Sequence, residues 1–530
     1  MTLLARTWMF ARSLLPGSLT LLGMLMTNTS VADPTHKFII TESGTPSSYD
    51  PLDADSADNL PLARMIYLTP LEVSGDDRLT STLLKSFSYD STSLTATWIV
   101  REGLNFSDGT PITPDDVAFA VARMAHRRPG FPVIMEIAGI DKWVHSVKPL
   151  YSFPEGIKVD GQAIKITFTS RINHPLFRFC LELFSVIPRS SVDQDTGRLK
   201  TKQPPTSGYY VISSREDSTI SFTRRPDIKM PGQEHAPKTI KFIYVKPQDL
   251  LSQANMIDDL TIAATNEALF KPEELKTLVS SFDQRDLPKA KFRAILINPD
   301  AAPFKNKMCR QIFAQSFREE YAKLMGSTDA IEGSISPKVV TGYAPLNAMT
   351  SALPAHTTQE IKKCLDDIAR VPIKAVFKKG TTTLFQEAVK NTLVRLGQPN
   401  AEPIAVDTFE KADQLFLEGK AQLAAIGSGL WALDPFGDLQ MLFTAGLHAP
   451  LVHLQRDSEL QKMLATLRTE MPPAERVALA LKVNQHLFED ATFNVYTHTR
   501  RFYLSKKGIS RGYLQASITS PAPWQLFAKP

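Results

Sequence analysis

Short apolar runs alternate with amphipathic segments after residue 290, and this alternation limits the fold more than any other feature of the chain. Phe292–Ile297 is almost entirely apolar, as is typical of a strand buried on both faces. Further strands are expected at Ile373–Phe377, Pro403–Val406 and Leu423–Ile426, with helices at 380–397 and 409–417 between them. Strands that alternate with helices predict an open α/β sheet with crossover connections.

The chain before residue 290 is predicted to be richer in β-structure. Phe38–Ile40 is a short apolar strand. In Ile157–Phe168, apolar and polar residues alternate on both sides of Asp160-Gly161, a pair that predicts the two-residue turn of a β-hairpin. Tyr209–Phe222 predicts a second hairpin. The order of elements therefore indicates a β-rich lobe followed by an α/β lobe.

The first 32 residues have the order of a secretory signal peptide. Arg6 and Arg12 come first, the apolar stretch Leu14–Met26 follows, and small or polar residues lead to Ala32. We predict cleavage after Ala32 and a periplasmic location. The alternative is an uncleaved membrane anchor, but Leu14–Met26 is shorter than the roughly 20 apolar residues that a bilayer requires. No other segment of the chain approaches that length.

Charge and cysteine content exclude several classes of protein. The chain has 60 basic and 55 acidic residues and no stripe of Lys and Arg interleaved with aromatics, so no nucleic-acid partner is expected. The three cysteines, Cys180, Cys309 and Cys364, are odd in number and lack metal-ligand spacing. We expect buried small hydrophobic residues without a disulfide framework. The sequence leaves their redox state open.

No catalytic, metal or cofactor motif can be named. The chain has no Gly-rich phosphate loop and no nucleophile elbow. His448 and His453 have the wrong spacing for two ligands on one helix face, and surface positions explain both. Asp258-Asp259 could be paired acid–base carboxylates, although a solvated turn explains the same pair. We therefore expect no metal, no cofactor and no enzymatic activity. A secreted hydrolase is the least favoured alternative.

Residues 98–124, WIVREGLNFSDGTPITPDDVAFAVARM, form the most distinctive motif. Asp108-Gly109 predicts a tight turn, and Thr113 is a good N-cap for a helix with Pro114 at its first position. These roles explain the residue types, so we assign the motif a structural role. It resembles the extracellular solute-binding protein family 5, the dipeptide- and oligopeptide-binding class of transporter receptors.

Other segments resemble the same family and occur in the same order. They are Tyr49-Asp50-Pro51, Pro205–Tyr210 with Arg225-Pro226-Asp227, Ile295–Phe317, Ser336-Pro337 with Gly342-Tyr343, and Trp431–Phe443. The resemblance covers nearly all of the mature chain.

The resemblance implies an α/β fold of the two-lobed periplasmic-binding-protein type II, with mixed sheets, two hinge crossings and an extra subdomain in lobe one. We place the signal peptide at 1–32, lobe one at 33–288 plus 497–530 with the subdomain at about 73–200, and lobe two at 289–496. It further implies that a small-molecule or peptide ligand is buried by hinge closure and presented by a monomer to an ABC permease in the inner membrane. Sensing or scavenging without a dedicated permease is the alternative function.

The expected ligand-binding residues are Trp431, Asp434, Tyr343 and Ser48. In peptide-binding members, an Asp shortly before the Asp-Pro element pairs with the α-amine of the peptide, whereas Trp431 stands three residues before Asp434 here. A buried ammonium needs a charged partner, so this difference argues against free-amine peptides. An aromatic side chain suits a sugar, a heterocycle or another apolar ligand. Core or hinge packing of Trp431, and a turn role for Asp434, are the alternatives.

Overall fold

The computed structural model describes most of the chain after residue 33. The described ranges are 34–41, 45–46, 48–53, 60–73, 78–129, 131–172, 175–229, 236–252, 254–286, 291–328, 331–338, 342–379, 383–400, 403–429, 451–508 and 523–527. The predicted signal peptide, Trp431 and Asp434 lie outside them.

Sheet A combines strands from both ends of the chain. Its order is β12 (Asp283–Asp286), β18 (Arg501–Ser505), β11 (Thr261–Asn266), β1 (His36–Thr41), β10 (Thr239–Val245), β9 (Thr219–Arg224) and β8 (Tyr210–Glu216). Strand β1 pairs in parallel with β10 and β11, whereas the other neighbours are antiparallel, so the sheet is mixed.

Sheet B is formed after residue 290. Its order is β15 (Ile404–Val406), β14 (Ala375–Lys378), β16 (Leu423–Gly429), β13 (Lys291–Ile297) and β17 (Phe493–Thr499). Strand β14 is parallel to β15 and β16, which confirms the crossover connections predicted from the sequence. Side chains of β13 alternate between two apolar clusters, because Phe292 and Leu296 pack on one face of the sheet while Ile295 and Ile297 pack on the other. The predicted buried strand is thereby confirmed.

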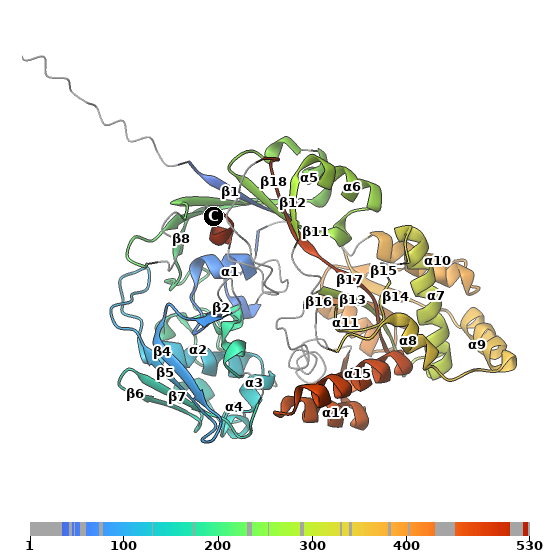
Figure 1. Ribbon diagram of the computed structural model, residues 1–530, viewed down its shortest axis with the longest axis horizontal. Helices are drawn as coiled ribbons and strands as arrows, with labels where there is room; N and C mark the ends of the chain where they lie inside the picture. The colour runs from blue at the N-terminus through green and yellow to red at the C-terminus, as the bar shows by residue number, and fades with distance from the viewer. Residues whose placement is uncertain are drawn as a thin grey trace, which may run out of the picture.

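Sheet C is an antiparallel sheet beside sheet A. Its order is β4 (Leu84–Asp90), β5 (Thr95–Val100), β7 (Ala163–Thr167) and β6 (Ile157–Asp160). Figure 1 shows sheets A and C in one half of the molecule and sheet B in the other. A short pair, β2 (Glu72–Val73) with β3 (Leu79–Thr80), completes the described strands.

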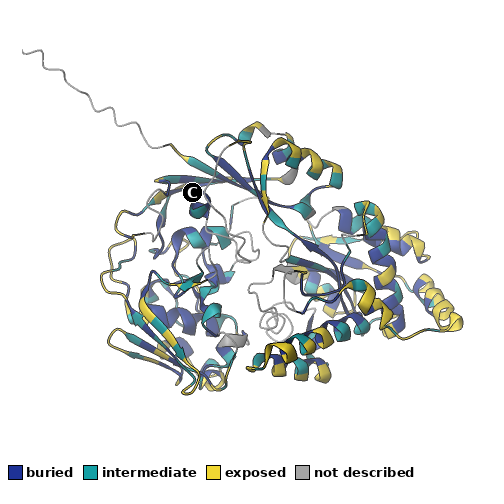
Figure 2. Cartoon of the chain, in the orientation of Figure 1, coloured by how far each residue is buried: buried dark blue, intermediate teal, exposed yellow. Residues whose placement is uncertain are grey.

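Helices surround these sheets. Beside sheets A and C lie α1 (Leu60–Ile66), α2 (Pro114–Arg127), α3 (Pro132–Met135), α4 (Ile140–Val144), α5 (Pro247–Ser252) and α6 (Pro272–Ser281). Beside sheet B lie α7 (Lys307–Met325), α8 (Leu346–Ser351), α9 (Thr358–Arg370), α10 (Thr383–Arg395), α11 (Phe409–Leu417), α13 (Val452–Gln455), α14 (Ser458–Arg468) and α15 (Pro473–Asp490). Exposed residues gather on the outer faces of these helices, whereas the central strands β11, β13 and β17 are mostly buried (Figure 2).

The predicted start of α2 is confirmed by a capping box. The Thr113 hydroxyl accepts a hydrogen bond from the Asp116 backbone nitrogen at 3.2 Å, and the Asp116 carboxylate accepts one from the Thr113 nitrogen at 2.9 Å. Two of the otherwise unpaired donors at the helix start are satisfied in this way. Gly109 has a φ of +86°, as the predicted turn requires. The motif at 98–124 therefore builds the fold, as the sequence indicated.

Both predicted hairpins are present, and one turn is shifted by a residue. Asp160 pairs with Ala163, so the two loop residues are Gly161 and Gln162 rather than Asp160 and Gly161. Gly161 has a φ of +54°, which glycine adopts without a steric penalty. In the second hairpin, β8 and β9 are paired up to Glu216 and Thr219.

Cys309 and Cys364 are buried as expected, but the expectation that they form no disulfide is wrong. Cys309 on α7 and Cys364 on α9 form a disulfide, with their Cα atoms 5.5 Å apart. The two positions are 55 residues apart in the chain. They meet only because both helices pack on the same face of sheet B, which linear spacing does not reveal. Cys180 is a free, half-buried thiol, and burial raises its pKa.

Candidate functional site

The chain passes directly from sheet B to sheet A at Arg500, between β17 and β18 (Figure 1). The Arg500 backbone nitrogen and Nε donate to the two carboxylate oxygens of Glu267 at 2.9 and 2.8 Å. Its Nη1 donates to Asp286, at the end of β12. The crossing is therefore anchored to the sheet A side by two carboxylates, while β17 belongs to sheet B.

A second contact joins the two halves far from this crossing. Arg468, at the end of α14, donates to Glu136, which follows α3, at 3.0 Å. The Ser170 hydroxyl donates a hydrogen bond to the other carboxylate oxygen of Glu136 at 2.8 Å. Next to this ion pair, Ile172 and Thr469 form an isolated antiparallel β-bridge. Among the described residues, the halves are thus joined at the Arg500 crossing and by a polar contact formed by Glu136, Arg468, Ile172 and Thr469, which we call the rim contact.

Removing the rim ion pair is expected to weaken ligand retention modestly. Partly exposed ion pairs contribute about 0.2–1 kcal/mol, so Arg468→Ala should reduce the affinity for a ligand identified by native mass spectrometry by up to about fivefold. Isothermal titration calorimetry on stripped and reloaded protein measures this change. Arg370→Ala, which removes an ion pair with Asp367 within α9, is the matched control and should leave the affinity unchanged. Equal affinities for wild type and Arg468→Ala would contradict a role for the rim contact in the ligand-bound form.

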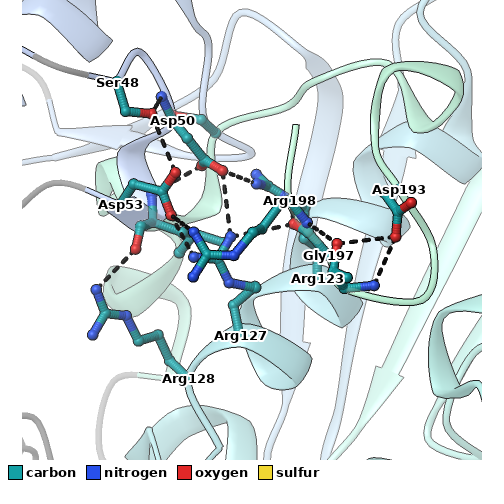
Figure 3. A network of polar contacts seen from close by, with 12 residues as sticks. Ser48, Asp50, Asp53, Arg123, Arg127, Arg128, Asp193, Gly197 and Arg198 are labelled. Carbon is teal, nitrogen blue, oxygen red and sulfur yellow. Dashed lines mark hydrogen bonds and ion pairs between the residues drawn. The ribbon is translucent and has the colours of Figure 1, made fainter. Parts of the chain in front are cut away.

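Ser48, one of the predicted ligand residues, lies in a network of buried charges (Figure 3). Its hydroxyl accepts a hydrogen bond from the Asp50 backbone nitrogen at 3.1 Å and donates to Asp53 at 3.2 Å. Asp50 pairs with Arg123 of α2, and both side chains are almost fully buried. Arg127, one turn later, contacts both Asp50 and Asp53. The Ser48 hydroxyl therefore forms its hydrogen bonds to Asp50 and Asp53, and the Asp50–Arg123 ion pair joins the Tyr49-Asp50-Pro51 segment to α2.

The charge of Arg127 favours the ionised form of Asp53. Burial by itself would raise the pKa of Asp53, but the hydrogen bond and charge of Arg127 outweigh it and hold the pKa below its usual value. Arg123 also donates through Nε to the Gly197 carbonyl at 2.8 Å, so its guanidinium has both a charge partner and a backbone partner.

Tyr343, a second predicted ligand residue, lies in a different cluster on the sheet B side. Its hydroxyl donates to the buried carboxylate of Glu332 at 3.1 Å. His498 of β17 and Lys338 approach the other oxygen of Glu332, at 3.9 and 3.7 Å. Burial would raise the pKa of Glu332, but His498, Lys338 and the Tyr343 hydroxyl together lower it. Burial and the Glu332 carboxylate raise the pKa of Tyr343 to about 12.

The structure thus places Ser48 and Tyr343 in separate networks, and no described contact joins them. Trp431 and Asp434 lie outside the described residues. Local sequence patterns could not reveal Glu332, His498 or the rim pair, because their partners are distant along the chain.

Several other candidates from the sequence take part in ordinary ion pairs. Asp258 pairs with Lys37 at 2.6 Å and Asp259 with Lys506 at 2.7 Å, so each carboxylate of this pair has its own cation. The expected surface position is wrong for His453, whose mostly buried ring lies 3.1 Å from Asp300. His448 lies outside the described residues. Among the described residues, no group of three His, Cys, Asp or Glu could hold a metal ion, and none of their helices is long and apolar enough to span a bilayer.

Comparison with known families gives one match that covers more than half of the chain. The model of "bacterial extracellular solute-binding proteins, family 5 Middle" matches residues 78–407. A comparison with curated protein sequences finds no match.

Solved structures of similar fold cover almost the whole chain. OppA of Haemophilus influenzae, in complex with the peptide RPPGFSPFR, has a TM-score of 0.71 at 13% identity, over 94% of this chain and 98% of that one. The murein tripeptide binding protein MppA of Escherichia coli has a TM-score of 0.71 at 15% identity, over 93% of this chain and 97% of that one. AgaA of A. tumefaciens, in complex with agropinic acid, has a TM-score of 0.70 at 15% identity, over 90% of this chain and 94% of that one. These similarities confirm the predicted two-lobed periplasmic-binding-protein fold.

Proposed function

Because the chain belongs to the bacterial extracellular solute-binding proteins of family 5, we propose that it is the substrate-binding component of an ABC importer. It captures a small solute between two lobes, closes around it and delivers it to a permease in the inner membrane as a monomer. The observation that carries this proposal is the fold similarity to binding proteins such as OppA over 94% of the chain. Members of this family are binding proteins rather than enzymes.

We assign lobe one to 33–288 plus 497–530, with its subdomain at about 73–200, and lobe two to 289–496. In this division, sheets A and C belong to lobe one and nearly all of sheet B belongs to lobe two. The single residue between β17 and β18 supports a hinge at Arg500, since short inter-element segments absorb the rotation in hinge closure. The rim contact is the kind of polar contact that closure forms on the side away from the hinge.

Two features support export to the periplasm with cleavage after Ala32. The first is the signal-peptide order of the first 32 residues. The second is the Cys309–Cys364 disulfide, because structural disulfides persist in oxidising compartments such as the bacterial periplasm and are rare in the cytosol.

The ligand is proposed to be a peptide-like or non-peptide solute that lacks a free α-amine at the usual anchoring position. Trp431 occupies that position in the sequence, and Asp434 follows it. The solved relatives show that this fold accommodates both peptides and non-peptide molecules, since AgaA is in complex with agropinic acid.

Trp431→Ala is expected to reduce ligand affinity by about tenfold or more, because truncated aromatic anchors in binding sites have effects of this size. The melting temperature of the ligand-free protein should stay nearly constant. Trp98→Ala is the contrasting variant, since Trp98 is fully buried in the core and its truncation should lower the stability of the ligand-free protein. Normal affinity with a large loss of stability in Trp431→Ala would show that Trp431 is a core residue.

Native mass spectrometry of protein purified without refolding tests the proposed function. A bound small molecule, released on denaturation and identified by its mass, is the expected result. A bound peptide with a free N-terminus would overturn the proposed ligand class while leaving the transport role intact. Turnover of ester or peptide substrates would instead favour a hydrolase.

A further inference from the structure

A cavity of about 260 Å³ opens among the helices beside sheet B. Its walls come from α7, α8, Thr328, Ile331, the end of α15 and the start of β17. Every lining residue lies within 311–353 or 488–494, so the cavity belongs to one lobe (Figure 1). Much of the wall is apolar, from Ala314, Ile331, Leu346, Leu353 and Phe488.

One side chain in this wall is a buried arginine. Arg318 of α7 is 7% exposed, and its guanidinium lies 4.8 Å from the centre of the Phe488 ring. Its Nε donates to the Val495 carbonyl at 3.2 Å, whereas Nη2 is buried and has no hydrogen-bond partner. No carboxylate within the described residues forms an ion pair with it. Burial lowers the pKa of Arg318 to about 10, so the side chain is still charged at neutral pH.

A second unpaired polar atom lies in the same wall. Asn494 of β17 is 1% exposed, and its Nδ2 donates to the Ala491 carbonyl, but its Oδ1 has no partner. Glu319, the acidic residue among the described lining residues, is already paired with Arg395 of α10 at 2.6 Å. The uncompensated charge of the described cavity wall is therefore the guanidinium of Arg318.

Such an arrangement is unfavourable in an empty protein. A buried charge without a counter-ion and a buried acceptor without a donor each reduce stability, and native proteins pair nearly all such groups. A ligand with an anionic end for Arg318 and an apolar body for the remaining wall would satisfy these groups. A carboxylate matches the planar, two-donor edge of a guanidinium.

We propose that this cavity is a second binding site, separate from the space between the lobes, for a small monocarboxylate with an apolar body. The carboxylate pairs with Arg318, and the body packs against Phe488 and the aliphatic wall. The volume limits the ligand to a small molecule, since pockets for drug-sized ligands are about 300–1,000 Å³.

Titration with benzoate and with hexanoate, followed by calorimetry, tests the site, and benzamide and hexanamide serve as uncharged counterparts. Both carboxylates should bind the wild-type protein, and each amide should bind at least about tenfold more weakly, because hydrogen bonds to charged groups contribute more than those to neutral ones. Arg318→Gln should reduce carboxylate affinity by at least about tenfold. Arg370→Gln, which removes an exposed arginine paired with Asp367 on α9 outside the cavity, is the matched control and should bind as wild type does.

Thr350→Trp supports the test if Arg318→Gln fails to fold. Thr350 is an exposed lining residue on α8, so a bulky side chain there should block the cavity with little effect on folding. Loss of carboxylate binding in this variant supports the proposal. The proposal is overturned if neither carboxylate binds the wild-type protein. It is also overturned if the carboxylates bind Arg318→Gln and Thr350→Trp as tightly as they bind wild type.

Discussion

Replacing Asp50 with alanine should lower the free energy of unfolding by about 3–5 kcal/mol, since the substitution leaves a buried charge without its partner. Arg123 is 3% exposed and Asp50 1% exposed, so neither is compensated by water. Arg127 would lose one of its two carboxylates as well. Urea unfolding followed by circular dichroism measures the change. The unfolding transition of the lobe that contains sheets A and C should shift to lower urea concentration.

A surface ion pair provides the control for this prediction. Lys379 and Asp407 are 2.6 Å apart but largely exposed, so Asp407→Ala should change the free energy of unfolding by less than about 1 kcal/mol. A loss from Asp50→Ala no larger than that from Asp407→Ala would contradict the structural role given to the Ser48–Asp53 segment.

Removal of the Cys309–Cys364 disulfide should destabilise the other half by a similar amount. In the chain-entropy model, a cross-link between positions 55 residues apart lowers the entropy of the unfolded chain and so raises its free energy by about 4 kcal/mol. The double variant Cys309→Ala/Cys364→Ala should therefore unfold at lower urea concentration than wild type, with the change confined to the transition of the region around sheet B.

Reductant separates this effect from simple loss of packing. Wild-type protein should be destabilised by dithiothreitol, whereas the double variant should be insensitive to it. Cys180→Ala is the matched control because Cys180 has no disulfide partner, and it should respond to dithiothreitol as wild type does. Wild-type stability that does not change with dithiothreitol, under conditions that fully reduce the Cys309–Cys364 disulfide, would contradict a stabilising disulfide.

Local sequence patterns predicted the elements whose causes are local. The capping box of Thr113 and Asp116, the apolar strand at Phe292–Ile297 and the hairpin after Ile157 follow from residues close together in the chain. The turn at Gly161 was misplaced by one residue because two neighbouring dipeptides fit the same loop, and cross-strand pairing decides between them.

Long-range contacts could not be predicted from such patterns. Cys309 meets Cys364, and Glu136 meets Arg468, through the packing of elements that are separate in sequence. Ser48 is a candidate by position alone, and its hydrogen bonds to Asp50 and Asp53 depend on a fold that local sequence does not show. Arg318 carried no sign in the sequence either, because an arginine on an amphipathic helix is usually a solvated residue.

Small-angle X-ray scattering of the protein with and without its co-purified ligand tests the central claim, capture by lobe closure. Protein stripped by partial unfolding and dialysis should have a larger radius of gyration than protein as purified, and adding back the ligand recovered from denatured sample should restore the smaller value. A radius of gyration that is the same in all three samples, with the ligand shown to be bound, would contradict closure around the ligand.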